Sequence, residues 1–122
     1  MRRRITKTRF GSITVGGTVF RYDVIVLPDG RVKRRKKKLS KAVYGTSHTI
    51  SRQEAKYVRK LARDSDRLIV GSGQYGNVEL SPEAAAYLKR KKCQVVLAPT
   101  PKAIDIWSRG TGRAIGLFHV TC

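Results

Sequence analysis

Hydrophobic and polar positions alternate along the first quarter of the chain, a pattern typical of β-strands with two different faces. The alternation predicts strands over residues 5–10, 12–15 and 18–27. Gly16-Gly17 fits a two-residue hairpin turn between the second and third strands. Leu27-Pro28-Asp29-Gly30 has the residues of a type I turn, with proline presetting the second position. The chain is therefore expected to open with a β-meander.

Hydrophobic positions change to helical spacing after residue 50. Ser51 and Glu54 have the pattern of a capping box, which predicts a helix from there to residue 63. Pro82, in the favoured first position after Ser81, predicts a second helix that ends at residue 92. A third helix is expected to begin with Thr100 as its cap and to end at residue 110.

Short apolar runs separate these helices. The runs at residues 68–70 and 94–97 predict buried strands. Residues 114–122 predict a last strand, which is apolar on both faces as far as Phe118 and is therefore expected in the centre of a sheet. Strands that alternate with helices indicate an α/β fold.

Several short motifs follow one another over nearly the whole chain: Phe10-Gly11, Pro28 with Gly30, Gly45-Thr46-Ser47-His48, Val70-Gly71-Ser72-Gly73, Thr100 with Ala103, and Phe118-His119-Val120-Thr121-Cys122. Together they resemble the Mth nine-three-eight-like family, a domain of unknown function. The resemblance implies a three-layer domain with a central mixed sheet, whose last strand runs antiparallel between the others. Animal members include a mitochondrial complex I assembly factor and an adipogenesis-associated protein. Those members carry tryptophans where this chain has its cations Arg34 to Lys38, so their partner surfaces are not expected here.

The length of 122 residues fits one domain, residues 1–122, with a single core. No apolar run reaches the roughly 18 residues of a membrane span. The basic start is followed by no apolar segment, so no secretory signal is expected. Two cysteines, Cys93 and Cys122, are too few for a disulfide framework. We expect a cytoplasmic monomer or homodimer that does not enter a membrane.

The formal net charge is +19, from 27 Lys and Arg against 8 Asp and Glu, and it favours contact with polyanions. One dense run of cations forms an expected polyanion patch: Arg31, Lys33, Arg34, Arg35, Lys36, Lys37 and Lys38. The patch either binds phosphates or protects an exposed edge strand from pairing with other chains. No aromatic residue lies between residues 31 and 38, so base stacking and sequence readout are not expected there.

Residues 71–76 match the letters Gly-x-Gly-x-x-Gly of a dinucleotide-binding loop but not its context. In that loop the glycines open a helix directly, whereas four further residues precede the helix start at Ser81. No acidic residue closes the next apolar strand to bind a ribose. No cofactor is therefore expected. Gly71 and Gly73 still permit a tight turn and a close approach of the backbone to another group.

His119 and Cys122 are candidates for a metal site or for a nucleophile. Residues three apart on a strand point to opposite faces, so we expect no ion to be shared between them. The two histidines and two cysteines also lack the spacing of structural zinc sites. The scattered acidic residues offer no evident carboxylate pair for acid–base catalysis. We expect no metal ion and no catalytic residue.

A small-anion site is expected where helix starts meet the glycine turn at one sheet edge. A helix packed antiparallel to its strand puts residues 48–51 near residues 71–73, and a last strand of opposite direction would bring Arg113 to the same edge. Helix amino ends and backbone N–H groups attract anions. The expected lining is Thr46, His48, Gly71, Ser72, Gly73, Thr100 and Arg113. The alternative is that these groups only cap helices and tighten turns.

The sequence favours a non-catalytic α/β domain that binds a protein partner, as an interaction or assembly module with a small-anion crevice. Sequence-nonspecific binding of nucleic acid through the basic surface is the main alternative. An enzyme with an anion-binding cleft is the third.

Overall fold

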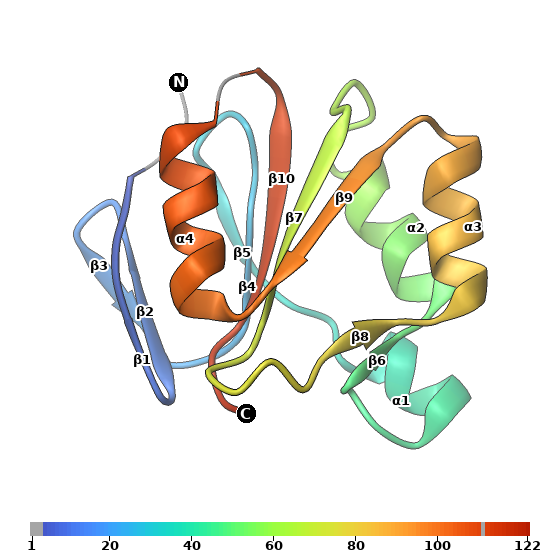
Figure 1. Cartoon of the computed structure of the whole chain (residues 1–122), viewed down its shortest axis with the longest axis horizontal. Helices are drawn as coiled ribbons and strands as arrows, with labels where there is room; N and C mark the ends of the chain where they lie inside the picture. Colours follow the sequence, from blue (N-terminus) through green and yellow to red (C-terminus); the bar gives the residue numbers. More distant parts are fainter. Residues whose placement is uncertain (1–3, 111) are drawn as a thin grey trace.

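A mixed five-stranded sheet lies in the middle of three layers (Figure 1). The computed structural model describes residues 4–110 and 112–122, so most of the basic start lies outside the described residues. The strands follow the order β5 (Val32–Arg34), β4 (Val24–Val26), β10 (Ala114–His119), β7 (Arg67–Ser72) and β9 (Gln94–Ala98). One face is covered by α2 (Arg52–Lys60) and α3 (Pro82–Arg90), the other by α4 (Thr100–Arg109) and the N-terminal strands. The expected three-layer α/β fold is confirmed.

The last strand, β10, is central, as predicted, and all of its residues are buried. It is antiparallel to β4 and parallel to β7, with Gly116 opposite Val26 on one side and Ile69 on the other. The expected antiparallel direction therefore holds for one neighbour and is wrong for the other. As a consequence, the carboxyl ends of β10 and β7 lie side by side, with His119 opposite Ser72.

The N-terminal strands β1 (Ile5–Arg9), β2 (Ser12–Val15) and β3 (Thr18–Phe20) form the predicted antiparallel meander. The predicted strand over residues 18–27 is, however, two strands in two sheets. The break falls before Asp23, whose buried carboxylate accepts hydrogen bonds from outside the meander. After the break, β4 enters the central sheet and pairs with β5, which lies at the edge.

The helices α2 and α3 begin at the predicted caps, because the hydroxyls of Ser51 and Ser81 each accept a hydrogen bond from the backbone N–H three residues on. Thr100 is the first residue of α4 but not its cap, since that position belongs to Pro99. The helix α1 (Lys38–Tyr44) was not predicted. Ser40 is its buried residue, so α1 has no apolar stripe that a sequence pattern could reveal.

Alternate residues of β7 fill the two halves of the core. Leu68 and Val70 pack with residues of α2 and α3, whereas Ile69 packs with Trp107 of α4. The strand β9, predicted to be buried, is an edge strand with Leu97 44% exposed. A short parallel pair, β6 (Thr49–Ile50) and β8 (Glu79–Leu80), extends the fold beside α1. No helix among the described residues is long and apolar enough to cross a membrane.

Candidate functional site

The sheet edge at the carboxyl ends of β7 and β10 brings together four of the residues expected at an anion site. The backbone N–H of Gly73 donates to the hydroxyl of Thr100 at 2.9 Å, and that hydroxyl donates to the carbonyl of His119 at 2.6 Å. Ser72 lies opposite His119 in the sheet. A Cβ on Gly71 would lie 2.8 Å from the Thr100 hydroxyl, so a glycine is needed for α4 to approach β7.

Arg113 does not belong to this edge, contrary to expectation. Because β10 runs parallel to β7, its first residues lie at the opposite end of the sheet, where Ala114 is opposite Arg67. Arg113 there forms an ion pair with Asp64, with Nε and Oδ2 2.7 Å apart. The expected site therefore loses its guanidinium.

Backbone N–H groups at this edge are paired within the chain. The backbone N–H of Thr100 donates to Gly73, that of Gln74 to the carbonyl of Thr121 at 2.6 Å, and that of Asn77 to the carbonyl of Cys122 at 3.2 Å. The tail formed by residues 120–122 thus lies against the glycine turn. A Cβ on Gly73 would overlap the backbone carbonyl of Cys122, so the group that the glycine turn approaches is this tail.

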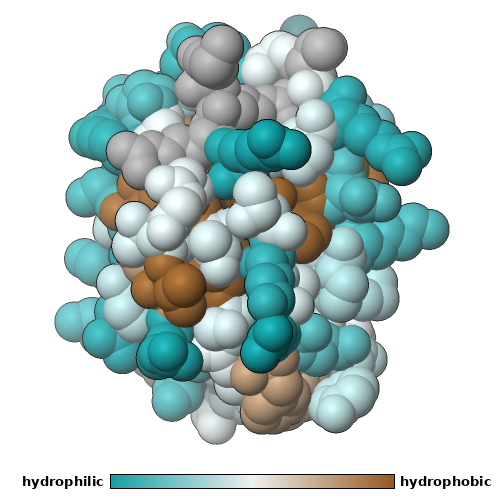
Figure 2. All heavy atoms as spheres, turned by 90° about the vertical axis from the view of Figure 1, so that its left-hand side faces the viewer, coloured by the Kyte–Doolittle hydropathy of each residue, from teal (hydrophilic) through white to brown (hydrophobic). Residues whose placement is uncertain are grey.

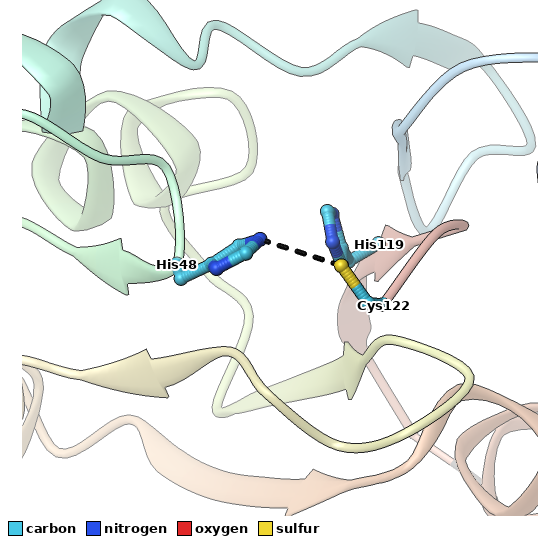
Figure 3. Close-up of side chains that lie close together, drawn as sticks. All are labelled: His48, His119 and Cys122. Atoms are coloured by element: carbon cyan, nitrogen blue, oxygen red, sulfur yellow. Dashed lines mark hydrogen bonds between the residues drawn. The ribbon is translucent and has the colours of Figure 1, made fainter.

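The last residue of this tail, Cys122, forms a cluster with two histidines (Figure 3). We call His48, His119 and Cys122 the His–Cys cluster. The Sγ atom of Cys122 lies 3.8 Å from Nε2 of His48, and the two imidazole rings meet edge to face with centroids 5.5 Å apart. The expectation that His119 and Cys122 point apart is wrong, because β10 ends at His119 and the chain no longer follows strand geometry beyond it.

His48 reaches the cluster from the loop between α1 and β6. The loop begins at Gly45, whose positive φ of 71° ends α1 in a left-handed turn. The hydroxyl of Thr46 accepts a hydrogen bond from the backbone N–H of His48 at 3.1 Å. Thr46 therefore shapes the loop that carries His48.

Arg35 was expected in the polyanion patch but is buried at the centre of an ion-pair network. Its guanidinium donates to Glu54 at 2.6 Å, to Asp23 at 2.9 Å and to the carbonyl of Ser47 at 2.7 Å. Burial would lower the pKa of Arg35, but the two carboxylates outweigh it and raise the pKa. Because Ser47 precedes His48, Arg35 also fixes the loop of the cluster. The Glu54 carboxylate therefore does not bind back to the Ser51 N–H, as a capping box would require, because it binds Arg35 instead.

Asp23 joins this network to the His–Cys cluster. Its carboxylate lies 2.6 Å from Nδ1 of His119 and accepts a hydrogen bond from the backbone N–H of Val120 at 2.9 Å. Burial would raise the pKa of Asp23, but the hydrogen bond and charge of His119, together with Val120 and Arg35, hold it at about 2. The sequence contained no local sign of this pairing, because Asp23 and His119 are far apart in the chain.

The other cations of the expected polyanion patch are at or near the surface, and several contact groups of the chain itself. Arg31 pairs with Asp29 at 2.8 Å, and Lys37 approaches Asp23 at 3.6 Å. The run itself contains no aromatic residue, but tyrosines from elsewhere in the chain lie against it. Arg34 lies over the ring of Tyr22 and Lys36 over that of Tyr57. Lys33 and Lys38 are exposed.

A second basic surface lies between α2 and α3. We call this groove of about 430 Å³ the helix groove; it is lined by Tyr87 and by seven cations, Arg52, Lys56, Arg59, Lys60, Arg63, Arg90 and Lys91. Helical spacing gives α2 a stripe of positive charge at positions 52, 56 and 59, and Arg63 follows in the turn after the helix. This groove was not predicted from the sequence, although that spacing was a signal for it. The Nε atom of Arg59 is buried with no hydrogen-bond partner among the described residues.

Comparison with known proteins gives a family and several solved structures. The family model described as protein of unknown function (DUF498/DUF598) matches residues 5–112. A conserved hypothetical protein from Pyrococcus horikoshii OT3 is 36% identical, with a TM-score of 0.88, over 98% of this chain and 99% of that one. The structure named MT938 is 33% identical, with a TM-score of 0.79, over 98% and 99%.

A Mth938-like domain from Bordetella pertussis is more distant. It is 17% identical with a TM-score of 0.65, over 97% of this chain and 85% of that one, and so shares the fold alone. A search among curated proteins gives no significant match.

Proposed function

Because the chain belongs to the DUF498/DUF598 family of unknown function, as its resemblance to Mth nine-three-eight-like proteins implied, we propose its function from its own surface. The proposal is a non-enzymatic binding module for the phosphate backbone of nucleic acid. The observation that carries it is the helix groove, where two separate cationic segments of the sequence meet.

The helix groove has the charge that a polyanion needs. Among the described residues, no acidic side chain lines it. Glu54 of α2 does not weaken its charge, because that side chain is buried and paired with Arg35 on the other side of the helix. The nine residues of α2 rise by about 12 Å, which matches three or four phosphates along one strand.

The groove favours backbone contact over sequence readout. Its aromatic residue, Tyr87, is only 6% exposed and already has Arg52 over its ring. An exposed aromatic platform for bases is therefore lacking among the groove residues. The expected affinity is on the order of 10⁻⁴ to 10⁻⁶ M at physiological salt, with little preference among sequences. A cytoplasmic location, where such polyanions occur, forms part of the proposal.

The test compares two variants of equal net charge. One changes Arg52, Lys56 and Arg63 of the helix groove to Gln; the other changes Lys7, Arg9 and Arg21 of the N-terminal strands to Gln. Each removes three positive charges from exposed positions. Binding of a short fluorescent DNA duplex and of its RNA counterpart is measured over a range of salt concentrations.

The groove variant is expected to lower the slope of log affinity against log salt by about 2 to 3, because each phosphate contact contributes roughly 0.7 to 0.9. The control variant should change it much less. An equal decrease of this slope in both variants would mean that only net charge matters, and it would refute the helix groove as the site.

A protein-interaction role is the second candidate, and one observation favours it. Phe10 and Tyr75, from two neighbouring turns, are 59% and 73% exposed, with ring centroids 6.1 Å apart. Exposed aromatic pairs are typical anchors of protein interfaces. The face of the N-terminal strands shows hydrophobic side chains between hydrophilic ones (Figure 2). A protein that copurifies with the wild-type chain and with Val19→Ser, but not with Phe10→Ser/Tyr75→Ser, would support this role.

A further inference from the structure

The geometry of the His–Cys cluster points to a metal site, and we propose that it binds one zinc(II) ion through His48, His119 and Cys122. The inference is independent of the proposed binding of nucleic acid, because the helix groove contributes none of these residues. It departs from the expectation, made from strand alternation, that this chain holds no metal.

The three side chains already lie close enough to share an ion. One ligand atom from each falls within 4.8 Å of the others, and the sulfur and one imidazole nitrogen are 3.8 Å apart. Bonds of about 2.0 Å to nitrogen and 2.3 Å to sulfur place tetrahedral ligands about 3.4 to 3.6 Å apart. The longest separation therefore has to contract by at most about 1.4 Å. Cys122 in the tail and His48 in its loop are only partly buried, so their side chains are not locked in the core.

The tautomer of His119 suits a metal ligand. The Asp23 carboxylate, an acceptor, lies 2.6 Å from Nδ1, so that nitrogen carries the proton and donates it. The Nε2 atom then keeps its lone pair, and its neighbour is the hydroxyl of Thr121 at 3.2 Å, which can rotate away. A carboxylate that holds a histidine in this way is the usual outer partner of a zinc ligand.

The outer partners also fix the second histidine. Arg35 bridges Asp23, behind His119, and the carbonyl of Ser47, beside His48. One buried guanidinium thus positions two ligands that come from distant parts of the sequence. Both histidines of the chain are in this cluster, although histidine is rare in the sequence. A hydrogen bond between His48 and Cys122 alone would not require the Asp23–Arg35 support.

The chemistry of the set favours zinc. Thiolate and imidazole are the ligands that zinc(II) shares with copper(I), whereas magnesium and calcium prefer oxygen. On binding, the Cys122 thiol loses its proton to solvent and the sulfur bonds to the metal. Three protein ligands leave a fourth tetrahedral position for water or another small ligand.

The experiment uses the full chain, reduced and stripped of metal by a chelator. Zinc(II) is titrated in competition with a chromophoric chelator, and cobalt(II) serves as a spectroscopic probe of thiolate ligation. The variants are Cys122→Ser and His48→Gln. Cys93→Ser is the matched control, because Cys93 is the other free cysteine and is buried in the core away from the cluster.

The wild-type chain and Cys93→Ser are expected to bind one zinc ion and to give the thiolate-to-cobalt charge-transfer band. Cys122→Ser should lose that band. Both cluster variants should lose affinity by more than the roughly 10- to 100-fold that the loss of an outer partner costs. Retained affinity in Cys122→Ser, or no zinc bound at one equivalent, would overturn the proposal. A parallel titration that finds copper(I) bound and zinc(II) not bound would overturn the choice of metal.

Discussion

Arg35 shows at the scale of a residue that position in a charged run does not decide what a charge does. The residue lies within a run of cations, yet it is 4% exposed and holds two carboxylates and a backbone carbonyl. Its neighbour Arg34 is exposed and lies over the ring of Tyr22. The pair therefore offers a direct comparison of a buried and an exposed arginine in one segment.

Replacing Arg35 by Gln is expected to lower the free energy of unfolding by about 3 to 5 kcal/mol, because Asp23 and Glu54 would remain buried without a compensating charge. Replacing Arg34 by Gln removes only an exposed contact with an aromatic ring and should cost about 1 kcal/mol or less. Urea unfolding of the two variants measures the difference. Equal stabilities would mean that the network does not support the fold.

At the scale of elements, short sequence patterns correctly predicted the features that interactions between adjacent residues determine. The serine caps of α2 and α3 were found because a hydroxyl that binds a nearby N–H leaves its pattern in adjacent residues. The glycine turn at 71–73 was recognised as a place of close approach because glycine itself, having no side chain, permits one. The groups that approach it come from other parts of the chain, and no pattern in adjacent residues names them.

The wrong predictions concern the direction of a strand and the residues at which strands end, because contacts between distant residues decide both. Arg113 was placed at the wrong sheet edge because one strand direction was assumed, and the chain order does not fix that direction. The His–Cys cluster was missed because β10 ends at His119, while the sequence continues with residues that suit a strand. The break before Asp23 was missed because its partners are Arg35 and His119, which are distant in sequence.

The contact between the glycine turn and the tail can be tested with two glycine-to-alanine changes. Gly73 and Gly17 have positive φ angles of 103° and 83°. A Cβ on Gly17 meets nothing within 4 Å, whereas one on Gly73 meets Cys122 and His119. Gly17→Ala should cost about 1 kcal/mol from the backbone alone, and Gly73→Ala about 3 kcal/mol or more from backbone and overpacking together.

Thermal unfolding of the metal-free variants gives the comparison without any contribution from zinc. A melting temperature for Gly73→Ala no lower than that for Gly17→Ala would contradict the packing of the tail against the turn.

At the scale of the whole molecule, few negative charges oppose a large positive excess. Of the eight acidic residues, Asp23 and Glu54 are buried with Arg35. Asp29 and Asp64 pair with arginines at the surface. Ionisation of a small number of carboxylates therefore has a large effect on the stability of a chain whose cations repel one another.

Asp23 is expected to make stability depend on acid pH. Its pKa is about 2 in the folded protein and 3.8 as an ordinary carboxyl, so the unfolded chain binds the proton first as pH falls. The stabilisation is complete above pH 3.8, is lost between that value and about 2, and amounts to about 2 kcal/mol. Repulsion among the cations adds to acid unfolding in any variant.

The measurement is the free energy of unfolding between neutral and acid pH for the metal-free wild type and for Asp23→Asn. The variant is expected to show a shallower decline below pH 3.8. Parallel curves for the two proteins would show that Asp23 does not contribute to the acid sensitivity.

The central place of β10 also has a consequence for how the chain is made. A ribosome delivers β4, β5, β7 and β9 before it delivers β10, yet these four strands form two separate pairs, β4 with β5 and β7 with β9. Until β10 emerges, β4 and β7 both expose apolar strand edges, which attract chaperones and other nascent chains. A nascent chain arrested after Arg109 is therefore expected to be cut readily by protease, and one extended beyond Cys122 by a linker to resist it. The central sheet is therefore completed only after β10 has been synthesised, and β10 enters it in the middle and not at an edge.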